Sequence, residues 1–341
     1  MNLRNKLIYF LLGGLILLLF FLINISLGSV SISFSETLKS LLGQPIENQS
    51  NAYIIKNYRF PKALTSILTG SGLAVSGLMM QTLFRNPLAG PYVLGLSSGA
   101  SLGVALVIMG SGVLFGFSSL VFSSWNIIIA ASLGSFLVML AVISASFRMK
   151  NTMGILIIGI MFAALTGAIV NILSYFSPSE ELQKYVFWSF GSLGNLSAQE
   201  LSILFLCWTI GLILCLFSLK SLNALLLGEN YAKSMGIQLK KNRFLVIIST
   251  CILAGSITAF AGPIAFVGLA VPHLIRLIIP TSNHLVLMPA VLIAGATLML
   301  ICDTIAQLPG SELTLPINAV TSIFGAPIVI WLILRKRKLV F

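Results

Sequence analysis

Long apolar runs, each near the length of a membrane span, limit what this chain can fold into. A helix needs about 20 apolar residues to cross the hydrocarbon layer. Only 8% of the 341 residues are charged and 57% are hydrophobic, whereas soluble domains carry about 25% charged residues. One soluble core cannot hide that much apolar surface. The sequence therefore predicts an all-α integral membrane protein with one membrane domain over residues 1–341.

Ten runs are expected to cross the bilayer, and the third and eighth lie near the short limit. Their approximate bounds are 7–27, 62–84, 93–110, 125–146, 153–175, 201–219, 244–262, 264–280, 285–304 and 317–334. The longest loop between them that is expected on the inside covers residues 220–243.

The distribution of basic residues indicates how these runs are oriented in the membrane. If the N-terminus lies in the cytoplasm, all but five of the 20 Lys and Arg residues fall in cytoplasmic segments, the usual bias of membrane proteins. The exceptions are Lys39, Lys56, Arg59, Lys62 and Lys184. We therefore predict a multi-pass protein with both termini in the cytoplasm. Contacts of basic side chains with lipid headgroups explain most of the net charge of +12. We therefore expect no nucleic-acid partner.

Residues that carry chemistry are scarce. The four cysteines lie inside apolar runs, and two histidines, His273 and His284, are too few for a metal site or a catalytic triad. No nucleotide-binding Gly-x-x-x-x-Gly-Lys loop is present. We therefore expect no catalytic residue, no cofactor and no metal site, and we do not expect the chain to be an enzyme. Acidic residues near the bilayer middle, which ion-coupled carriers usually need, are also missing, so energy would come from a partner protein.

Two similar segments indicate an internal repeat. Residues 67–77 read ILTGSGLAVSG and residues 252–262 read ILAGSITAFAG, with six identical positions. Five predicted spans separate them, so the copies would run in opposite directions through the membrane, as in many transporters. The small residues have a packing role of at least equal weight, because they let helix backbones approach closely.

The stretch RNPLAGPYVLGLSSGASLG, residues 85–103, breaks the second run. Asn86-Pro87 stops a helix and Gly90-Pro91 makes a second break. Irregular backbone at membrane depth survives only when it is packed in protein or lines a cavity. We therefore expect this stretch in the interior, at the cytoplasmic end of the second span.

Two charged segments have open interpretations. Residues 220–244 read as two short helices broken at Gly236, with an apolar stripe that is either a docking surface or an interfacial helix. The stripe consists of Leu225, Leu226, Ala232 and Met235. Lys56, Arg59 and Lys62 in KNYRFPK either anchor a helix end or await an acidic partner outside.

Several motifs together resemble the FecCD family, the permeases of ABC importers for iron chelates and vitamin B12. The resemblance covers residues 50 to 335, and its motifs occur in the family's order. They are RFPKALTSILTGSGLAVSGLMMQTLFRNPLAGPYVLGLSSGAS, LGENYAKSMGI, AFVGLAVPHLIR, CDTIAQ and LPINAVTSIFGAPIVIWLI.

The resemblance implies a type II ABC importer permease fold of ten transmembrane helices with an inverted repeat. It implies a homodimer with the pathway at its axis, two ABC ATPase subunits on the cytoplasmic face and an extracytoplasmic substrate-binding protein. The cargo would be a siderophore, haem or cobalamin, and the location the bacterial plasma (inner) membrane. The alternative is a secondary carrier that does not depend on ATP, and a structural scaffold is disfavoured by the repeat.

The resemblance also assigns candidate residues. Lys62 and Gln307 stand where many members have arginine, and burial is the alternative for the three pathway residues. The assignments are binding-protein docking by Arg59, Lys62 and Gln307, a cytoplasmic gate at Asn86, Pro87 and Leu88, ATPase coupling through Leu227, Gly228, Glu229, Ala232, Met235 and Gly236, and pathway lining by Thr166, Asn171 and Ser174.

Overall fold

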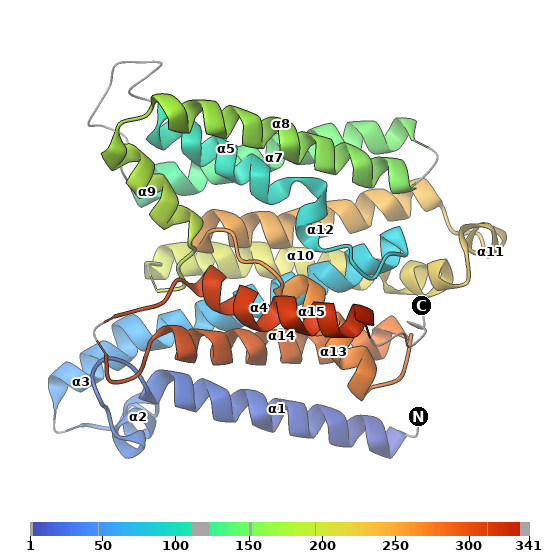
Figure 1. The fold of residues 1–341 in the computed structure, drawn as a ribbon. Helices are drawn as coiled ribbons and strands as arrows, with labels where there is room; N and C mark the ends of the chain where they lie inside the picture. Colours follow the sequence, from blue (N-terminus) through green and yellow to red (C-terminus); the bar gives the residue numbers. More distant parts are fainter. Residues whose placement is uncertain are drawn as a thin grey trace. The chain divides into compact units, whose positions relative to one another are not determined.

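Helices and loops make up all of the chain that the computed structural model describes, which is residues 3–46, 48–110, 123–149, 152–194, 196–311 and 313–334 (Figure 1). The basic residues expected at the C-terminal end, Arg335 to Lys338, and Lys150 lie outside these ranges. The predicted all-α class is confirmed.

All ten predicted runs coincide with helices. These are α1 (Leu3–Ser26), α4 (Phe60–Phe84), α5 (Leu96–Ile108), α7 (Ser124–Arg148), α8 (Thr152–Phe176), α10 (Ala198–Leu226), α12 (Leu239–Ala261), α13 (Val267–Ile278), α14 (His284–Ala306) and α15 (Ile317–Leu334). Among the described residues, seven helices are long and apolar enough to cross a membrane, and α5, α13 and α15 are shorter apolar helices. That every one of the ten crosses the bilayer stays a prediction.

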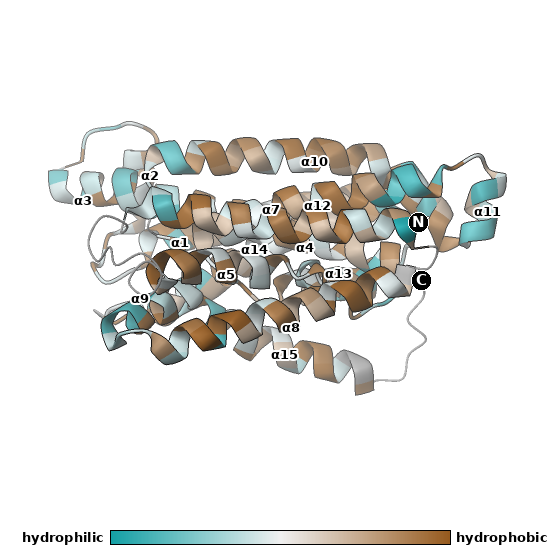
Figure 2. Cartoon of the chain, turned by 90° about the horizontal axis from the view of Figure 1, so that it is seen from above, coloured by the Kyte–Doolittle hydropathy of each residue, from teal (hydrophilic) through white to brown (hydrophobic). Residues whose placement is uncertain are grey.

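Short polar helices occupy the connections between the apolar runs, and one of them lies in residues 220–244, where short helices were expected. They are α2 (Phe34–Leu41), α3 (Gln49–Ile54), α9 (Ser179–Ser189) and α11 (Glu229–Ser234), with a π-helical turn at Ile55–Arg59 and a 3-10 turn at Pro91–Leu94. Figure 2 shows hydrophobic colours along α7, α8, α10 and α12 and hydrophilic colours at α3, α9 and α11. This distribution matches apolar spans joined by polar connections.

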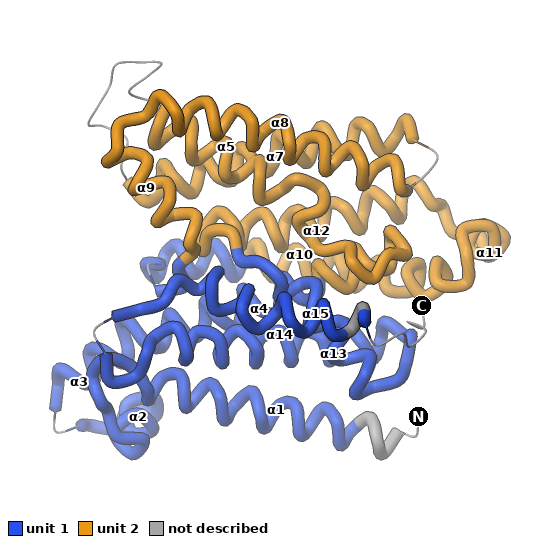
Figure 3. Tube along the Cα trace, viewed as in Figure 1, with its two compact units in different colours: residues 1–75, 192–205, 264–338 blue, residues 76–191, 206–263, 339–341 orange. Residues whose placement is uncertain are grey.

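The chain forms two compact units (Figure 3). Unit 1 contains residues 1–75, 192–205 and 264–338, and unit 2 contains residues 76–191, 206–263 and 339–341. Both α4 and α10 begin in unit 1 and end in unit 2.

Small residues bring the backbones of α5 and α7 together in unit 2. A Cβ atom on Gly134 would lie 2.0 Å from the carbonyl oxygen of Gly99, and one on Gly103 would lie 2.0 Å from that of Ala130. Ser135 Oγ donates to the Leu96 carbonyl at 3.0 Å, where α5 begins. The glycine- and serine-rich stretch is therefore interior, as expected, because only glycine permits this approach.

The two repeat segments make corresponding contacts. A Cβ atom on Gly70 of α4 would lie 2.2 Å from the Gly295 carbonyl oxygen of α14 in unit 1. A Cβ atom on Gly255 of α12 would meet Ser135 of α7 at 3.7 Å in unit 2. In the order of the ten runs, α4 and α12 are second and seventh, whereas α7 and α14 are fourth and ninth. Each copy thus packs against the equivalent partner from the other half, as an inverted repeat requires.

The α5–α7 contact predicts a position-specific cost for one methyl group. Gly134→Ala should destabilise the protein by roughly 1–3 kcal/mol, because the new Cβ must displace a backbone carbonyl. Gly167→Ala in α8 is the matched control, since nothing lies within 4 Å of its Cβ position. Thermal unfolding in detergent checks this, and equal midpoints for the two variants would contradict the close packing.

Candidate functional site

Asp303 is the centre of a buried polar cluster in unit 1. Its carboxylate is 2% exposed and lies near the C-terminal end of α14. One oxygen pairs with Lys62 Nζ at 3.1 Å, and the other accepts hydrogen bonds from Asn24 Nδ2 at 2.9 Å and Gln307 Nε2 at 2.8 Å. A buried carboxylate needs such compensation. Lys62 and Gln307, the predicted docking residues, are therefore both bound to an acid of their own chain.

Arg59, the third predicted docking residue, caps the end of α1. Its guanidinium donates to the carbonyls of Ile25 at 2.9 Å and Ser26 at 2.7 Å, and also to that of Val30. The last carbonyls of a helix have no partner within the helix and carry its negative end charge. Only 8% of Arg59 is exposed. Its position fits the helix-anchoring interpretation of the basic cluster, and its docking role stays a prediction.

The Asn86-Pro87-Leu88 turn ends α4 as predicted. Arg85 has φ +48°, in the left-handed region that stops a helix. The side chain of Asn86 accepts from the Leu88 N–H at 2.9 Å, so the turn is held by its own first residue. The Leu88 side chain is 44% exposed.

Arg85 connects this turn to the end of α10, a contact that the sequence analysis missed. Its Nη2 donates to the Leu225 carbonyl at 2.7 Å and the Leu226 carbonyl at 3.3 Å, and its Nε donates to Leu225 at 3.2 Å. A basic residue directly before Asn86-Pro87 was the only signal in the sequence for this contact. No spacing of residues predicted that its partner would be the end of α10.

Two glycines and one ion pair shape the connection after α10, which we call the coupling segment (residues 227–238). Gly228 has φ +116°, a conformation that side chains rarely adopt. At the other end of α11, Gly236 has φ +81°, and the Ile237 N–H bonds to the Ala232 carbonyl at 3.0 Å, which is the usual glycine-terminated helix end. Glu229 pairs with Arg243 of α12 at 2.8 Å, which fixes the segment to the next span.

The exposed apolar residues of the coupling segment differ from the predicted stripe. Leu225 and Ala232 are buried, because α10 continues to Leu226 and because α11, which contains Ala232, packs on α12. The predicted second short helix is also absent from the described residues, since α12 already begins at Leu239. The exposed apolar set is Leu227 at 65%, Tyr231 at 52% and Met235 at 59%.

The three predicted pathway residues of α8 have different surroundings. Thr166 is buried, and its hydroxyl donates to the Phe162 carbonyl at 2.8 Å. Ser174 is half-buried, with its hydroxyl 3.7 Å from the Met109 sulfur. Asn171 is exposed. Of the three, Asn171 is the most exposed, and the lining role of all three stays a prediction.

No metal-binding group is found in the described ranges, since no three His, Cys, Asp or Glu side chains gather in one place.

Comparisons with known proteins match nearly the whole chain. Residues 16–335 match the FecCD transport family. The vitamin B12 import system permease protein BtuC of Klebsiella pneumoniae is 38% identical over 285 residues, which are 82% of each chain. The hemin transport system permease protein HmuU of Yersinia pestis is 35% identical over 331 residues, which are 96% of each chain.

Solved structures agree with these matches. A metal-chelate type ABC transporter in an inward-facing conformation superposes with a TM-score of 0.83 at 31% identity, covering 96% of this chain and 98% of that chain. PsaBC from Streptococcus pneumoniae superposes with a TM-score of 0.56 at 15% identity, covering 88% of this chain and 95% of that chain, which shows a similar fold.

The Asp303 cluster predicts a specific loss of stability. Lys62→Met should lower the free energy of unfolding by roughly 3 kcal/mol, because it leaves a buried carboxylate without its cation. The double variant Lys62→Met/Asp303→Asn should recover most of this loss. Lys56→Met, at an exposed lysine nearby, is the control. Unfolding in detergent measures all three, and a Lys62→Met protein as stable as Lys56→Met would refute the pairing.

Proposed function

The chain belongs to the FecCD transport family, and from this premise we propose how its residues take part in ATP-driven import. It is the permease subunit of an ABC importer, a class that works with ATPase and substrate-binding partners. The relatives are named for vitamin B12 and hemin. We infer a cargo of the same chemical class, an iron chelate such as a siderophore or haem, or cobalamin.

The coupling segment carries the proposal. Leu227, Tyr231 and Met235 are exposed although they are apolar, and we infer that each of two ATPase subunits covers one such set. The Glu229–Arg243 pair and the hydrogen bond from Ile237 to Ala232 hold the segment, so it would move as one body when the ATPases close.

Arg85 would carry this motion to the Asn86-Pro87-Leu88 turn. Its guanidinium bonds to the last carbonyls of α10, directly before the coupling segment, and its backbone begins the turn. A movement of the segment would therefore displace the turn, which is the proposed cytoplasmic gate. ATP binding would shift the population between two access states, because the ATPases bind the two states with different affinity.

The binding protein would dock at the other predicted surface. Lys56 is exposed and would present positive charge to an acidic partner. Lys62 is 24% exposed in its side chain, and we infer that it would contact the same partner while it stays paired with Asp303. Arg59 and Gln307 would help to position this surface. Arg59 does so by its hydrogen bond to the end of α1, and Gln307 by its hydrogen bond to Asp303.

Dimer formation, topology and location complete the proposal. We infer a homodimer with α8 beside the pathway, because one side of α8 is exposed along its length. Its exposed apolar residues include Ile157, Met161, Leu165, Ile172 and Tyr175. The termini would lie in the cytoplasm and the protein in the bacterial plasma membrane.

The secondary-carrier alternative needs an ionisable group that can change its charge during transport. Asp303, which the sequence places near a span end, is paired with Lys62 and hydrogen-bonded twice more. This arrangement favours a structural acid and supports ATP-driven import.

Reconstitution tests the function directly. Proteoliposomes containing this chain, its ATPase and its binding protein should accumulate labelled cobalamin, haem or a ferric siderophore only with ATP. Accumulation without ATP would support the secondary carrier, and failure with every chelate in an ATP-hydrolysing complex would refute the cargo class.

The exposed apolar set predicts where the ATPase binds. Leu227→Asp should abolish co-purification of the ATPase, because it places a charge in a desolvated contact. Leu42→Asp is a matched control, since Leu42 is 66% exposed and Leu227 is 65% exposed. Equal ATPase recovery with both variants would contradict the assignment.

The Arg85 contact predicts uncoupling. Arg85→Gln should retain ATPase binding and hydrolysis but lower the uptake per ATP hydrolysed roughly tenfold, because charged hydrogen bonds of about 1.5–3 kcal/mol are lost. Lys220→Gln, at an exposed basic residue of α10, is the control. An unchanged ratio of uptake to hydrolysis in Arg85→Gln would sink the proposed link.

A further inference from the structure

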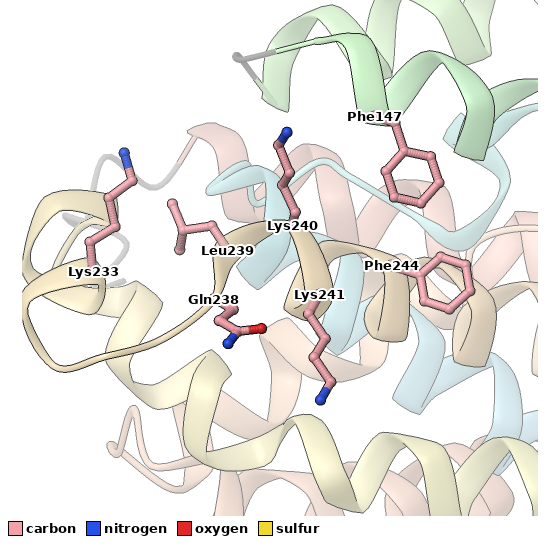
Figure 4. A pocket seen from close by; sticks show the side chains of 7 residues that line it. All are labelled: Phe147, Lys233, Gln238, Leu239, Lys240, Lys241 and Phe244. Carbon is pink, nitrogen blue, oxygen red and sulfur yellow. The ribbon is translucent and has the colours of Figure 1, made fainter.

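We propose that a recess formed by α7, α11 and α12 binds the headgroup of an anionic phospholipid. The recess has a volume of about 600 Å³ and belongs entirely to unit 2 (Figure 4). It is lined by Phe147, Lys233, Gln238, Leu239, Lys240, Lys241 and Phe244. The inference rests on the membrane location of the chain and does not depend on the identity of the cargo.

The charge of the recess selects an anion. Three of its seven lining residues are lysines and none is acidic. Glu229, the one acid of residues 220–243, pairs with Arg243. In Figure 4 the side chains of Lys233 and Lys240 point to the same side, whereas that of Lys241 points to the other side. Gathering like charges is unfavourable, and a bound phosphate would relieve it.

The aromatic residues distinguish a lipid from a soluble anion. Phe147 in the last turn of α7 and Phe244 near the start of α12 stack with ring centroids 6.1 Å apart. They are 53% and 38% exposed. A soluble phosphate would gain nothing from these rings, whereas the glycerol and upper acyl chain of a phospholipid would cover them.

The level of the recess in the membrane fits a headgroup. Both α7 and α12 are long enough to span a bilayer, and the recess lies where α7 ends at Arg148 and α12 begins at Leu239. A neighbouring hollow of about 660 Å³ shares Phe147 and reaches Arg148 and Ile158 of α8. Basic pockets between spanning helices at this level bind anionic headgroups, so the lysines would hold the phosphate while the hollow receives the chains.

A lipid competition experiment tests the site. The full chain is equilibrated with phosphatidylglycerol and phosphatidylcholine, and the retained lipids are counted by native mass spectrometry. The unmodified chain should prefer phosphatidylglycerol, and Lys233→Gln/Lys240→Gln should reduce this preference roughly tenfold. Lys39→Gln/Lys220→Gln removes the same charge at exposed lysines outside the recess and should leave the preference unchanged.

Two further measurements decide between lipid and other occupants. A phosphatidylglycerol with a photoreactive headgroup should label peptides containing Phe147 or Phe244, and excess glycerol 3-phosphate should not prevent the labelling. Thermal unfolding in phosphatidylcholine establishes that the double variant folds. If the double variant folds and keeps its preference for phosphatidylglycerol, the proposal is wrong. This holds even if the same variant no longer binds the ATPase. Full protection by glycerol 3-phosphate overturns it in favour of a soluble anion.

Discussion

The structure depends on supplying hydrogen-bond donors to helix ends. Each helix leaves its last carbonyls without a partner inside the helix, and a buried carbonyl that stays unpaired costs free energy. Two arginines meet this need. Arg59 donates to the end of α1 and Arg85 to the end of α10. Each lies near one end of α4, so in both units the cap ties α4 to a second helix.

The same constraint explains why the irregular stretches are interior. The stretch after α4 is held by the Asn86 side chain and by Ser135, and small residues press α5 onto α7. The coupling segment is mostly exposed instead, and it turns sharply at Gly228 and Gly236. At both stretches, side-chain hydrogen bonds or glycines thus take over where the backbone leaves the regular helix.

Local signals in the sequence predicted the helices but could not predict their long-range partners. The apolar runs located ten helices, Asn86-Pro87 located the end of α4, and the glycines located close contacts. The bonds of Arg85 to α10 and of Lys62 to Asp303 join residues that no spacing relates. The prediction of an exposed apolar stripe was wrong for a related reason. The periodicity within residues 220–244 could not show that α10 continues to Leu226 and that Leu225 is buried.

The central claim is that the Asn86-Pro87-Leu88 turn and the coupling segment form one rigid body joined by Arg85. Spin labels on Leu88 and Met235, which are both exposed and both in unit 2, report their separation in the assembled transporter. With only one protomer of the proposed dimer labelled, so that no distance between protomers is recorded, we predict one narrow distance distribution that does not change between the nucleotide-free and ATP-bound states, and a broader one in Arg85→Gln. A shift of several ångströms on ATP binding in the unmodified protein would contradict the rigid link.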